Sequence, residues 1–379
     1  MSQNGYVFKK GRSWFLRYWT NVLVDGQMVR KQKCGKLAPC SDVYRSKGAL
    51  KDLVKQKLAS VEAADKCPQS STAFVEYVER TYLPFVLRTK KASTYAGYCT
   101  YFERYIKPRA GKYALGGFTV AIVSELLDGI ANDHKVNTET IGKVRSILAG
   151  VFTYAMAKGH FPGKNASENP ASSAMIPEAA SEPCPTTAAT REEVMAILGA
   201  LKDMSLERAA VATVTMLGVR PGEARGLRWE DWDRAKQQIH VERSVWHTIE
   251  GTTKTEQSVR FLAVSGELRE VLLALWNERG CPLGGYILAG PRGGRPVILD
   301  NLAKRSIRKQ LEKANLTWPG WYSLRRFHGT EVRAKSSIDT TAKALGNSPA
   351  IADKHYNKPT EVLPDVRKAV NDAVSGLIH

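Results

Sequence analysis

Four side chains, each in its own local motif, have the chemistry to open a phosphodiester bond without a metal ion. Arg220 stands in the sequence Gly-Val-Arg-Pro-Gly-Glu, and Lys254 begins the sequence Lys-Thr-Glu-Gln-Ser-Val-Arg. Arg325 ends the sequence Tyr-Ser-Leu-Arg, and Tyr356 stands nine residues after Asn347, the last residue of a Leu-Gly-Asn triplet. Two arginines, a lysine and a tyrosine are the residue types that DNA cleavage by a protein nucleophile requires.

Each residue type answers one demand of that reaction. The pentacoordinate transition state gathers negative charge on the non-bridging oxygens of the phosphate. Guanidinium groups suit these oxygens because they are permanently charged, planar and able to donate two parallel hydrogen bonds. The leaving 5′ oxygen needs a proton, which a lysine on a hairpin turn can deliver. A phenol with a pKa of about 10 needs a base or a positive local field before it can attack.

The order and settings of these motifs resemble those of the tyrosine recombinases, the family of the phage-type integrases. The motif around Arg220 is the most specific part of the resemblance. The resemblance implies that Arg220 and Arg325 clamp the scissile phosphate and that Lys254 protonates the 5′ oxygen. It also implies that Tyr356 attacks to form a 3′-phosphotyrosyl link and that Glu223 braces the first arginine. The implied activity is that of a site-specific DNA strand transferase.

Two positions depart from the family pattern. Tyr322 replaces the histidine of His-x-x-Arg, and Asn347 replaces the histidine of Leu-Gly-His. Both substitutes can hydrogen-bond a phosphate oxygen, Asn347 as a donor, but neither brings a charge or an easily titrated base. His328 is interpreted as a neighbour of the site, whereas His355 directly precedes the nucleophile and is the better candidate to assist it. We therefore expect an active but slower enzyme.

The charge of the chain predicts a polyanionic partner. Lys and Arg number 56 against 37 Asp and Glu, which gives a net charge of +19 and a sequence pI of about 9.6. Residues 1–60 hold thirteen of the basic residues and only three acidic ones. This asymmetry indicates a separate basic module at the N-terminus. Nucleic acid is the favoured partner, with a solvated basic surface or a membrane surface as the alternatives.

The N-terminal module is predicted to be a three-stranded sheet followed by a helix from about residue 47 to residue 64. Residues 6–8, 13–19 and 28–33 read as strands, and Asp25-Gly26 is a hairpin signal. Trp14 and Tyr18 are expected in the core of this module. The pattern resembles the arm-type DNA-binding domains of phage integrases. Six basic side chains are the expected DNA contacts: Lys10, Arg12, Arg17, Arg30, Lys31 and Lys33.

The predicted fold class is multidomain α+β. Residues 1–64 form the basic arm-binding module, residues 73–170 an all-α core-binding domain, and residues 187–379 a mixed α/β, mainly helical catalytic domain. Residues 65–72 and 171–189 read as linkers, and Thr190 with Glu193 forms a capping box that starts the last domain.

Periodicity predicts further elements within the two larger domains. Helical spacing runs through residues 74–78, 95–105 and 138–158. Residues 238–245 and 259–264 read as alternating strands, with a turn at Glu250-Gly251 between them. An amphipathic helix is expected from about Pro364 to the end of the chain.

No cofactor or metal is expected. The six cysteines form no Cys-x-x-Cys pair, no apolar run reaches the length of a membrane span, and the start carries no signal-peptide pattern. A cytoplasmic, nucleoid-associated protein is expected, bound to duplex DNA with core and arm sites. The resemblance implies a homotetramer on DNA, together with DNA-bending accessory proteins. Two alternatives remain open: a recombinase-like DNA-binding protein with a weakened active site, and an enzyme like a type IB topoisomerase.

Overall fold

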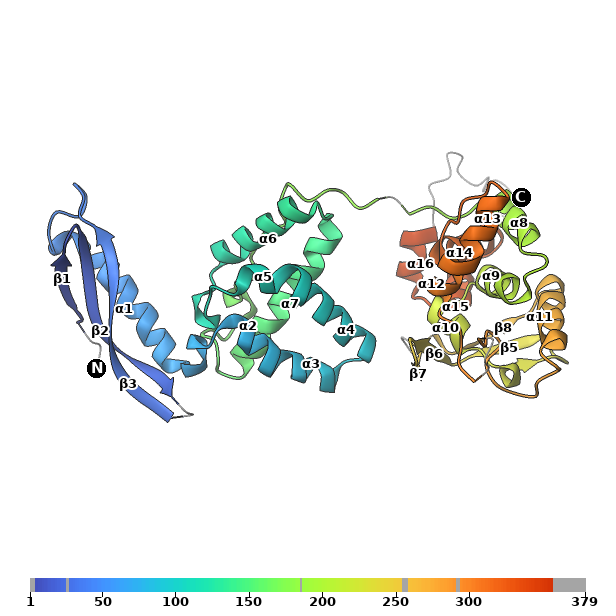
Figure 1. Cartoon of the computed structure of the whole chain (residues 1–379), viewed down its shortest axis with the longest axis horizontal. Coiled ribbons are helices and arrows are strands. Elements are labelled where there is room, and N and C mark those ends of the chain that lie inside the picture. The colour runs from blue at the N-terminus through green and yellow to red at the C-terminus, as the bar shows by residue number, and fades with distance from the viewer. Residues whose placement is uncertain (1–3, 25–26, 185, 254–257, 291–293, 357–379) are drawn as a thin grey trace, which may run out of the picture. The chain divides into compact units, whose positions relative to one another are not determined.

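The chain divides into two compact units, Met1–Cys184 and Pro185–His379 (Figure 1). The computed structural model describes residues 4–24, 27–184, 186–253, 258–290 and 294–356. Lys254, the predicted hairpin turn Asp25-Gly26 and the predicted C-terminal helix from Pro364 lie outside the described residues. No helix in the described ranges is long and apolar enough to cross a membrane.

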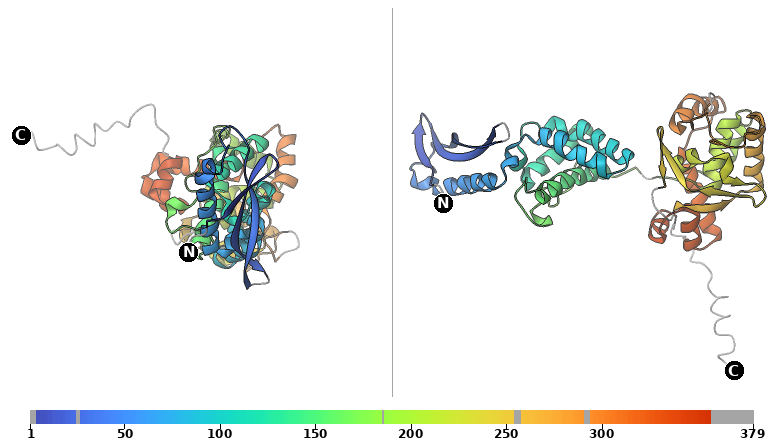
Figure 2. Two further views of the ribbon diagram at one scale, coloured as in Figure 1. Left: turned by 90° about the vertical axis from the view of Figure 1, so that its left-hand side faces the viewer. Right: turned by 90° about the horizontal axis from the view of Figure 1, so that it is seen from below.

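Unit 1 begins with a small antiparallel sheet and one helix. These elements are β1 (Tyr6–Lys10), β2 (Ser13–Val24), β3 (Gln27–Pro39) and α1 (Lys51–Lys66), with the strand order β1-β2-β3. Trp14 and Leu16 alternate with outward-facing residues and are buried together with Leu50, just before α1. Figure 2 shows α1 lying along one face of the sheet. The predicted strands are confirmed, although β2 and β3 run further than expected, because Val24 still pairs with Gln27.

The rest of unit 1 is helical, as expected. Its helices are α2 (Phe74–Tyr77), α3 (Leu83–Thr89), α4 (Ala92–Tyr101), α5 (Lys107–Ala110), α6 (Val120–His134) and α7 (Thr138–Ala157). Phe74, Phe118 and Phe152 pack against one another in its core. The expected linker at residues 65–72 is partly ordered. Lys66 still belongs to α1, because neither it nor Asp65 breaks a helix, and Pro68–Ser71 forms a 3-10 turn.

Unit 2 is built around one almost wholly buried helix. Its helices are α8 (Arg191–Ala200), α9 (Ser205–Leu217), α10 (Pro221–Gly226), α11 (Gly266–Glu278), α12 (Leu299–Leu302), α13 (Arg308–Lys313), α14 (Trp321–Lys335), α15 (Ile338–Leu345) and α16 (Pro349–Tyr356). Apolar and small residues cover nearly every position of α9, which contacts α8, α10, α11 and α14. The predicted capping box is confirmed: the Thr190 side chain accepts from the Glu193 N–H, and the Glu193 carboxylate accepts from the Thr190 N–H.

The strands of unit 2 differ from the prediction. They are β4 (Trp232–Asp233), β5 (Gln238–Val241), β6 (Arg243–Trp246), β7 (Ile249–Thr252) and β8 (Arg260–Ala263). The three-stranded sheet has the order β4-β5-β8, and β6 and β7 form a separate hairpin. The predicted turn at Glu250-Gly251 is wrong. Glu250 lies within β7 because Arg228 and Tyr286 hydrogen-bond its carboxylate, and the chain turns at His247, whose φ is +51°.

Candidate active site

Three helix ends meet at the candidate site. Gly218 ends α9 and Gly346 ends α15, both in the left-handed conformation with φ of +61°. Arg220 follows immediately as the N-cap of α10. The last carbonyl groups of a helix have no partner within it, and they carry the negative end of the helix dipole. The site therefore offers acceptors to cations before any ligand is present.

Arg325 is fixed by two of these helix ends. It lies in the second turn of α14 and its side chain is almost completely buried. Its Nη1 donates to the Gly218 carbonyl at 2.7 Å, and its Nη2 donates to the Leu345 carbonyl at 2.8 Å. Because both acceptors belong to helix C-termini, the guanidinium is held in one orientation by backbone alone.

Arg220 lies beside it and is more accessible, with 21% of its side chain exposed. Its Nη2 donates to the Gly346 carbonyl at 2.9 Å and to the Asn347 Oδ1 at 2.6 Å. Its Nη1 donates to the Ser258 Oγ at 3.1 Å. Residues far apart in the sequence thus hold this guanidinium, which leaves its exposed edge as the part that a ligand can reach.

Glu223 lies behind both arginines and is 1% exposed. Its carboxylate accepts hydrogen bonds from the Arg220 backbone N–H at 3.0 Å, from Arg220 Nη1 at 2.6 Å and from Arg260 Nη2 at 3.2 Å. It also lies 3.9 Å from Arg325 Nη1. Burial alone would raise the pKa of Glu223, but the charges of Arg260 and Arg220 outweigh burial and lower it. The carboxylate is therefore ionised and braces a group of three cations.

Asn347 joins the two arginines that the sequence predicted to form a clamp. Its Oδ1 accepts from Arg220 Nη2 at 2.6 Å and from Arg325 Nη2 at 3.3 Å. A guanidinium can only donate, so the oxygen of the amide must be the atom that faces them. The sequence predicted Asn347 as a phosphate donor; in the ligand-free site it acts as an acceptor, and only its Nδ2 remains for that role. We call Arg220 and Arg325 the arginine clamp.

Arg260 is a part of the site that sequence reasoning did not select. Its side chain is 8% exposed, and besides Glu223 it donates to the Ala344 carbonyl at 2.8 Å and to the Ser258 carbonyl at 2.7 Å. Burial lowers the pKa of Arg260, against the effect of Glu223. A signal was present in the sequence: within the alternating strand, Arg260 shares its face with Leu262 and Val264, and a charged residue on an apolar face needs a buried partner.

His328 lies one turn after Arg325 but belongs to the scaffold of the clamp. Its Nδ1 lies 3.1 Å from the Thr215 carbonyl, which can only accept, so this nitrogen carries the proton. Burial, followed by the charges of Arg325 and Arg260, lowers the pKa of His328 to about 4. The neutral ring packs directly against Gly218, where a Cβ atom would collide with it.

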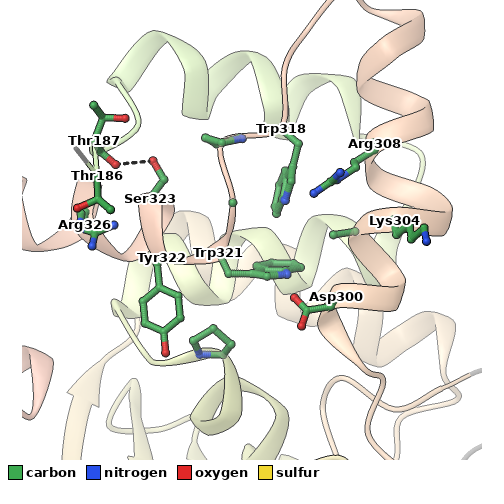
Figure 3. A pocket seen from close by; sticks show the side chains of 14 residues that line it. Thr186, Thr187, Asp300, Lys304, Arg308, Trp318, Trp321, Tyr322, Ser323 and Arg326 are labelled. Carbon is green, nitrogen blue, oxygen red and sulfur yellow. Dashed lines mark hydrogen bonds between the residues drawn. The ribbon is translucent and has the colours of Figure 1, made fainter. Parts of the chain in front are cut away.

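The other predicted catalytic residues are placed less completely. Tyr322 is 57% exposed, at the edge of a hollow that Pro221 also lines (Figure 3). Tyr356 ends α16, which packs against α14 and α15. Its backbone is therefore brought to the helices that carry Arg325 and precede Asn347. The side chains of Tyr356 and His355, like the whole of Lys254, lie outside the described part of the structure.

The predicted DNA contacts of unit 1 are all exposed: Lys10, Arg12, Arg17, Arg30, Lys31 and Lys33. Two of them lie over aromatic rings, Arg17 over Phe8 at 5.2 Å and Arg30 over Trp19 at 5.7 Å. Such cation–π contacts orient a guanidinium while leaving its N–H groups available. Across the described residues of both units, no group of three or more His, Cys, Asp or Glu side chains is arranged to hold a metal ion.

Comparisons with known proteins bear on the same assignment. No protein-family model matches the chain. It is 25% identical over 304 residues to a protein described as "Tyrosine recombinase XerC-like" from Caldanaerobacter subterraneus subsp. tengcongensis, covering 71% of this chain and 74% of that relative. The Tn1549 transposon integrase in complex with transposon right end DNA aligns with a TM-score of 0.64 at 15% identity, over 79% of this chain and 99% of that one. The lambda integrase tetramer bound to a Holliday junction aligns over 96% of this chain and 98% of that one, with a TM-score of 0.57 and 16% identity.

Proposed function

This chain belongs to the tyrosine recombinase family, and on that premise we propose that it cuts and rejoins DNA strands at specific sites through a 3′-phosphotyrosyl intermediate. The reaction would integrate or excise a mobile element. The observation that carries the proposal is the convergence of Arg220 and Arg325 on Asn347 Oδ1. That oxygen marks the place where a non-bridging phosphate oxygen would meet both guanidinium groups. Clamp residues from distant motifs thus share one binding position, as charge stabilisation of the transition state requires.

The proposed steps use residues of this chain alone. The Tyr356 phenol oxygen attacks the phosphorus in line, and the bond from phosphorus to the 5′ oxygen breaks. The phenol proton passes to a base, for which His355 is the candidate, and Lys254 protonates the departing 5′ oxygen. The arginine clamp neutralises the non-bridging oxygens throughout. A 5′ hydroxyl then attacks the phosphotyrosyl group in the reverse sense, which releases Tyr356 and rejoins a strand.

The remaining parts of the chain fit the same activity. We assign residues 1–64 to arm-site binding through Arg17, Arg30 and the neighbouring cations, residues 73–170 to core-site binding and residues 187–379 to catalysis. Assembly as a homotetramer on DNA, with DNA-bending accessory proteins, and association with the nucleoid complete the proposal. The lambda integrase relative was captured as such a tetramer. The buried, fully bonded clamp supports an enzyme over a binding-only protein.

Trapping of the covalent intermediate tests the proposal. A core site is first recovered from random duplexes by selection with the protein, and it is then nicked beside the scissile phosphate so that the short 5′ fragment diffuses away. The wild type should accumulate an adduct that survives denaturation, and Tyr356→Phe should form none. Tyr113→Phe, the same chemical change in unit 1, serves as the control and should retain the adduct. A wild type that binds the selected site without ever forming an adduct would refute strand transfer.

A further inference from the structure

A hollow of about 790 Å³ opens in unit 2 next to the arginine clamp. Pro221, which directly follows Arg220, lines it on one side, and Tyr322 lines it three residues before Arg325 (Figure 3). Its far wall is the segment of residues 186–187, held in place because the Ser323 Oγ donates to the Thr187 carbonyl at 2.9 Å. A ligand that spans the hollow would therefore continue directly from a phosphate held in the clamp.

Three basic side chains face this hollow from separate stretches of the chain. Lys304 lies in the π-helical turn after α12, Arg308 begins α13, and Arg326 lies in α14. In Figure 3, Arg326 lies on one side beside residues 186–187, and Lys304 and Arg308 lie on the other. None of the three forms an ion pair with a described residue. Elsewhere in unit 2 the arginines are matched by carboxylates, so this concentration of uncompensated positive charge indicates an anionic ligand.

Trp321 supplies a second and independent sign of a ligand. Its side chain is 5% exposed, yet its indole Nε1 has no hydrogen-bond partner among the described residues. Buried donors are normally paired, and an unpaired one costs free energy. The indole lies across the floor of the hollow between Tyr322 and Asp300, with Trp318 packed edge-on at 4.9 Å (Figure 3). An acceptor oxygen inside the hollow would satisfy this N–H.

The chemistry of the lining selects one class of acceptor. Trp321 and Tyr322 form the first turn of α14, where the helix dipole favours an anion. Asp300 contributes one carboxylate, which reduces the net charge that faces the ligand and disfavours a multiply charged anion. A phosphodiester carries a single negative charge and two acceptor oxygens, and the DNA strand seated in the clamp presents such groups at every nucleotide.

We propose that this hollow binds a second phosphodiester of the cleaved strand, next to the scissile phosphate, through Lys304, Arg308, Arg326 and the Trp321 Nε1. The proposal rests on the proposed function, because it takes the strand to be seated in the clamp. The contact fixes the position of the strand along the site and contributes to affinity without taking part in the bond changes.

Binding of the selected core duplex to single variants tests the assignment. Arg308→Ala and Trp321→Phe should each weaken binding, by about tenfold for the arginine because hydrogen bonds to charged groups are the stronger class. The slope of log affinity against log salt should fall by about 0.9 for Arg308→Ala, as for one lost phosphate contact. Lys309→Ala removes the same charge from the adjacent exposed position of α13, outside the hollow, and should change binding far less.

Asp300→Asn decides the sign of the ligand. It should tighten binding if a phosphodiester fills the hollow, and it would weaken binding if the hollow took an amino group of a base instead, which would overturn the proposal. A duplex with one uncharged methylphosphonate beside the scissile position should bind wild type less tightly and Arg308→Ala equally well. Competition by inorganic phosphate but not by this substitution would point to a free anion and also overturn it.

The outcomes are separable from failure of the proposed function. Adduct formation by the wild type reports strand transfer, whereas the methylphosphonate comparison reports only the hollow. Equal loss of affinity for Arg308→Ala and Lys309→Ala, with adduct formation intact, would refute the second phosphate contact and leave the recombinase assignment standing.

Discussion

Replacement of Glu223 by glutamine is the most direct test of how the arginine clamp is held together. The side chain keeps its size and can still accept hydrogen bonds through one oxygen. It loses the charge that Arg220 at 2.6 Å and Arg260 at 3.2 Å share, and it places an amide N–H₂ against guanidinium donors. Arg325, 3.9 Å away, loses its nearest carboxylate as well. Three buried or half-buried cations would then face one another without a counter-charge.

The size of the effect follows from the burial of the group. Removal of one partner from a buried ion pair costs about 3–5 kcal/mol, because the remaining charge is left without compensation. Glu223 is 1% exposed, so little of that cost is relieved by water. Its net interaction with the arginines lowers its pKa, which means that the carboxylate stabilises the fold in its ionised form. That contribution is fully present above the unfolded-state pKa of about 4.3 and is lost as the pH falls through the lower folded-state pKa.

The assay is chemical denaturation of the wild type and Glu223→Gln at neutral pH, together with adduct formation on the nicked core site. We expect unit 2 to lose about 3 kcal/mol of unfolding free energy and the adduct to form about a hundredfold more slowly, because Arg220 loses its orientation. Glu139→Gln, which removes an exposed helical ion pair with Lys143 in unit 1, is the control and should cost less than about 0.5 kcal/mol. Equal stability of the two variants would refute the idea that Glu223 braces the clamp.

Two further predictions concern residues around the clamp. Asn347→Asp keeps the acceptor for both arginines, so unfolding free energy should hold or rise, while adduct formation should fall by about two orders of magnitude because a carboxylate repels the phosphate; Asn347→Ala should instead lose about 1–2 kcal/mol of stability. His328 has a folded-state pKa of about 4, below its unfolded value of about 6.5, so the unfolded chain binds its proton first and stability falls as the pH falls between these values. Between pH 7 and pH 5 the wild type should lose about 2 kcal/mol on this account, and denaturation of His328→Gln across the same range should lack that component.

The sequence carried local information about the site and little about its long-range contacts. Arg220 could be selected because its motif is a helix start, with Gly218 before it and Pro221 after it, and such signals are written within a few residues. Arg260 could not be selected in the same way, because its partners Glu223 and Ala344 lie 37 and 84 residues away. The secondary structure failed for a related reason.

The misplaced turn in the hairpin illustrates that reason. A Glu-Gly pair next to β-forming residues reads as a turn by local propensity, but Glu250 is held in β7 by Arg228, 22 residues earlier, and by Tyr286, 36 residues later. Tertiary hydrogen bonds of this kind override a local preference worth about 1 kcal/mol or less. Strand existence was therefore predictable here, whereas the turn position depended on residues that the local pattern does not contain.

The bonds of the empty clamp explain how asparagine can serve at position 347. With no ligand present, Arg220 and Arg325 are already aligned by helix-end carbonyls and meet at one neutral acceptor, the Asn347 Oδ1. A phosphate oxygen that enters the clamp replaces a neutral acceptor by a charged one, and charge-assisted hydrogen bonds are the stronger class. The exchange is therefore favourable and needs no reorientation of the backbone that holds the arginines, which is the condition for electrostatic stabilisation to act at the moment of reaction. A charged histidine at this position could not accept from the arginines, so the resting clamp would have to be aligned by other means; in this chain the asparagine provides that alignment.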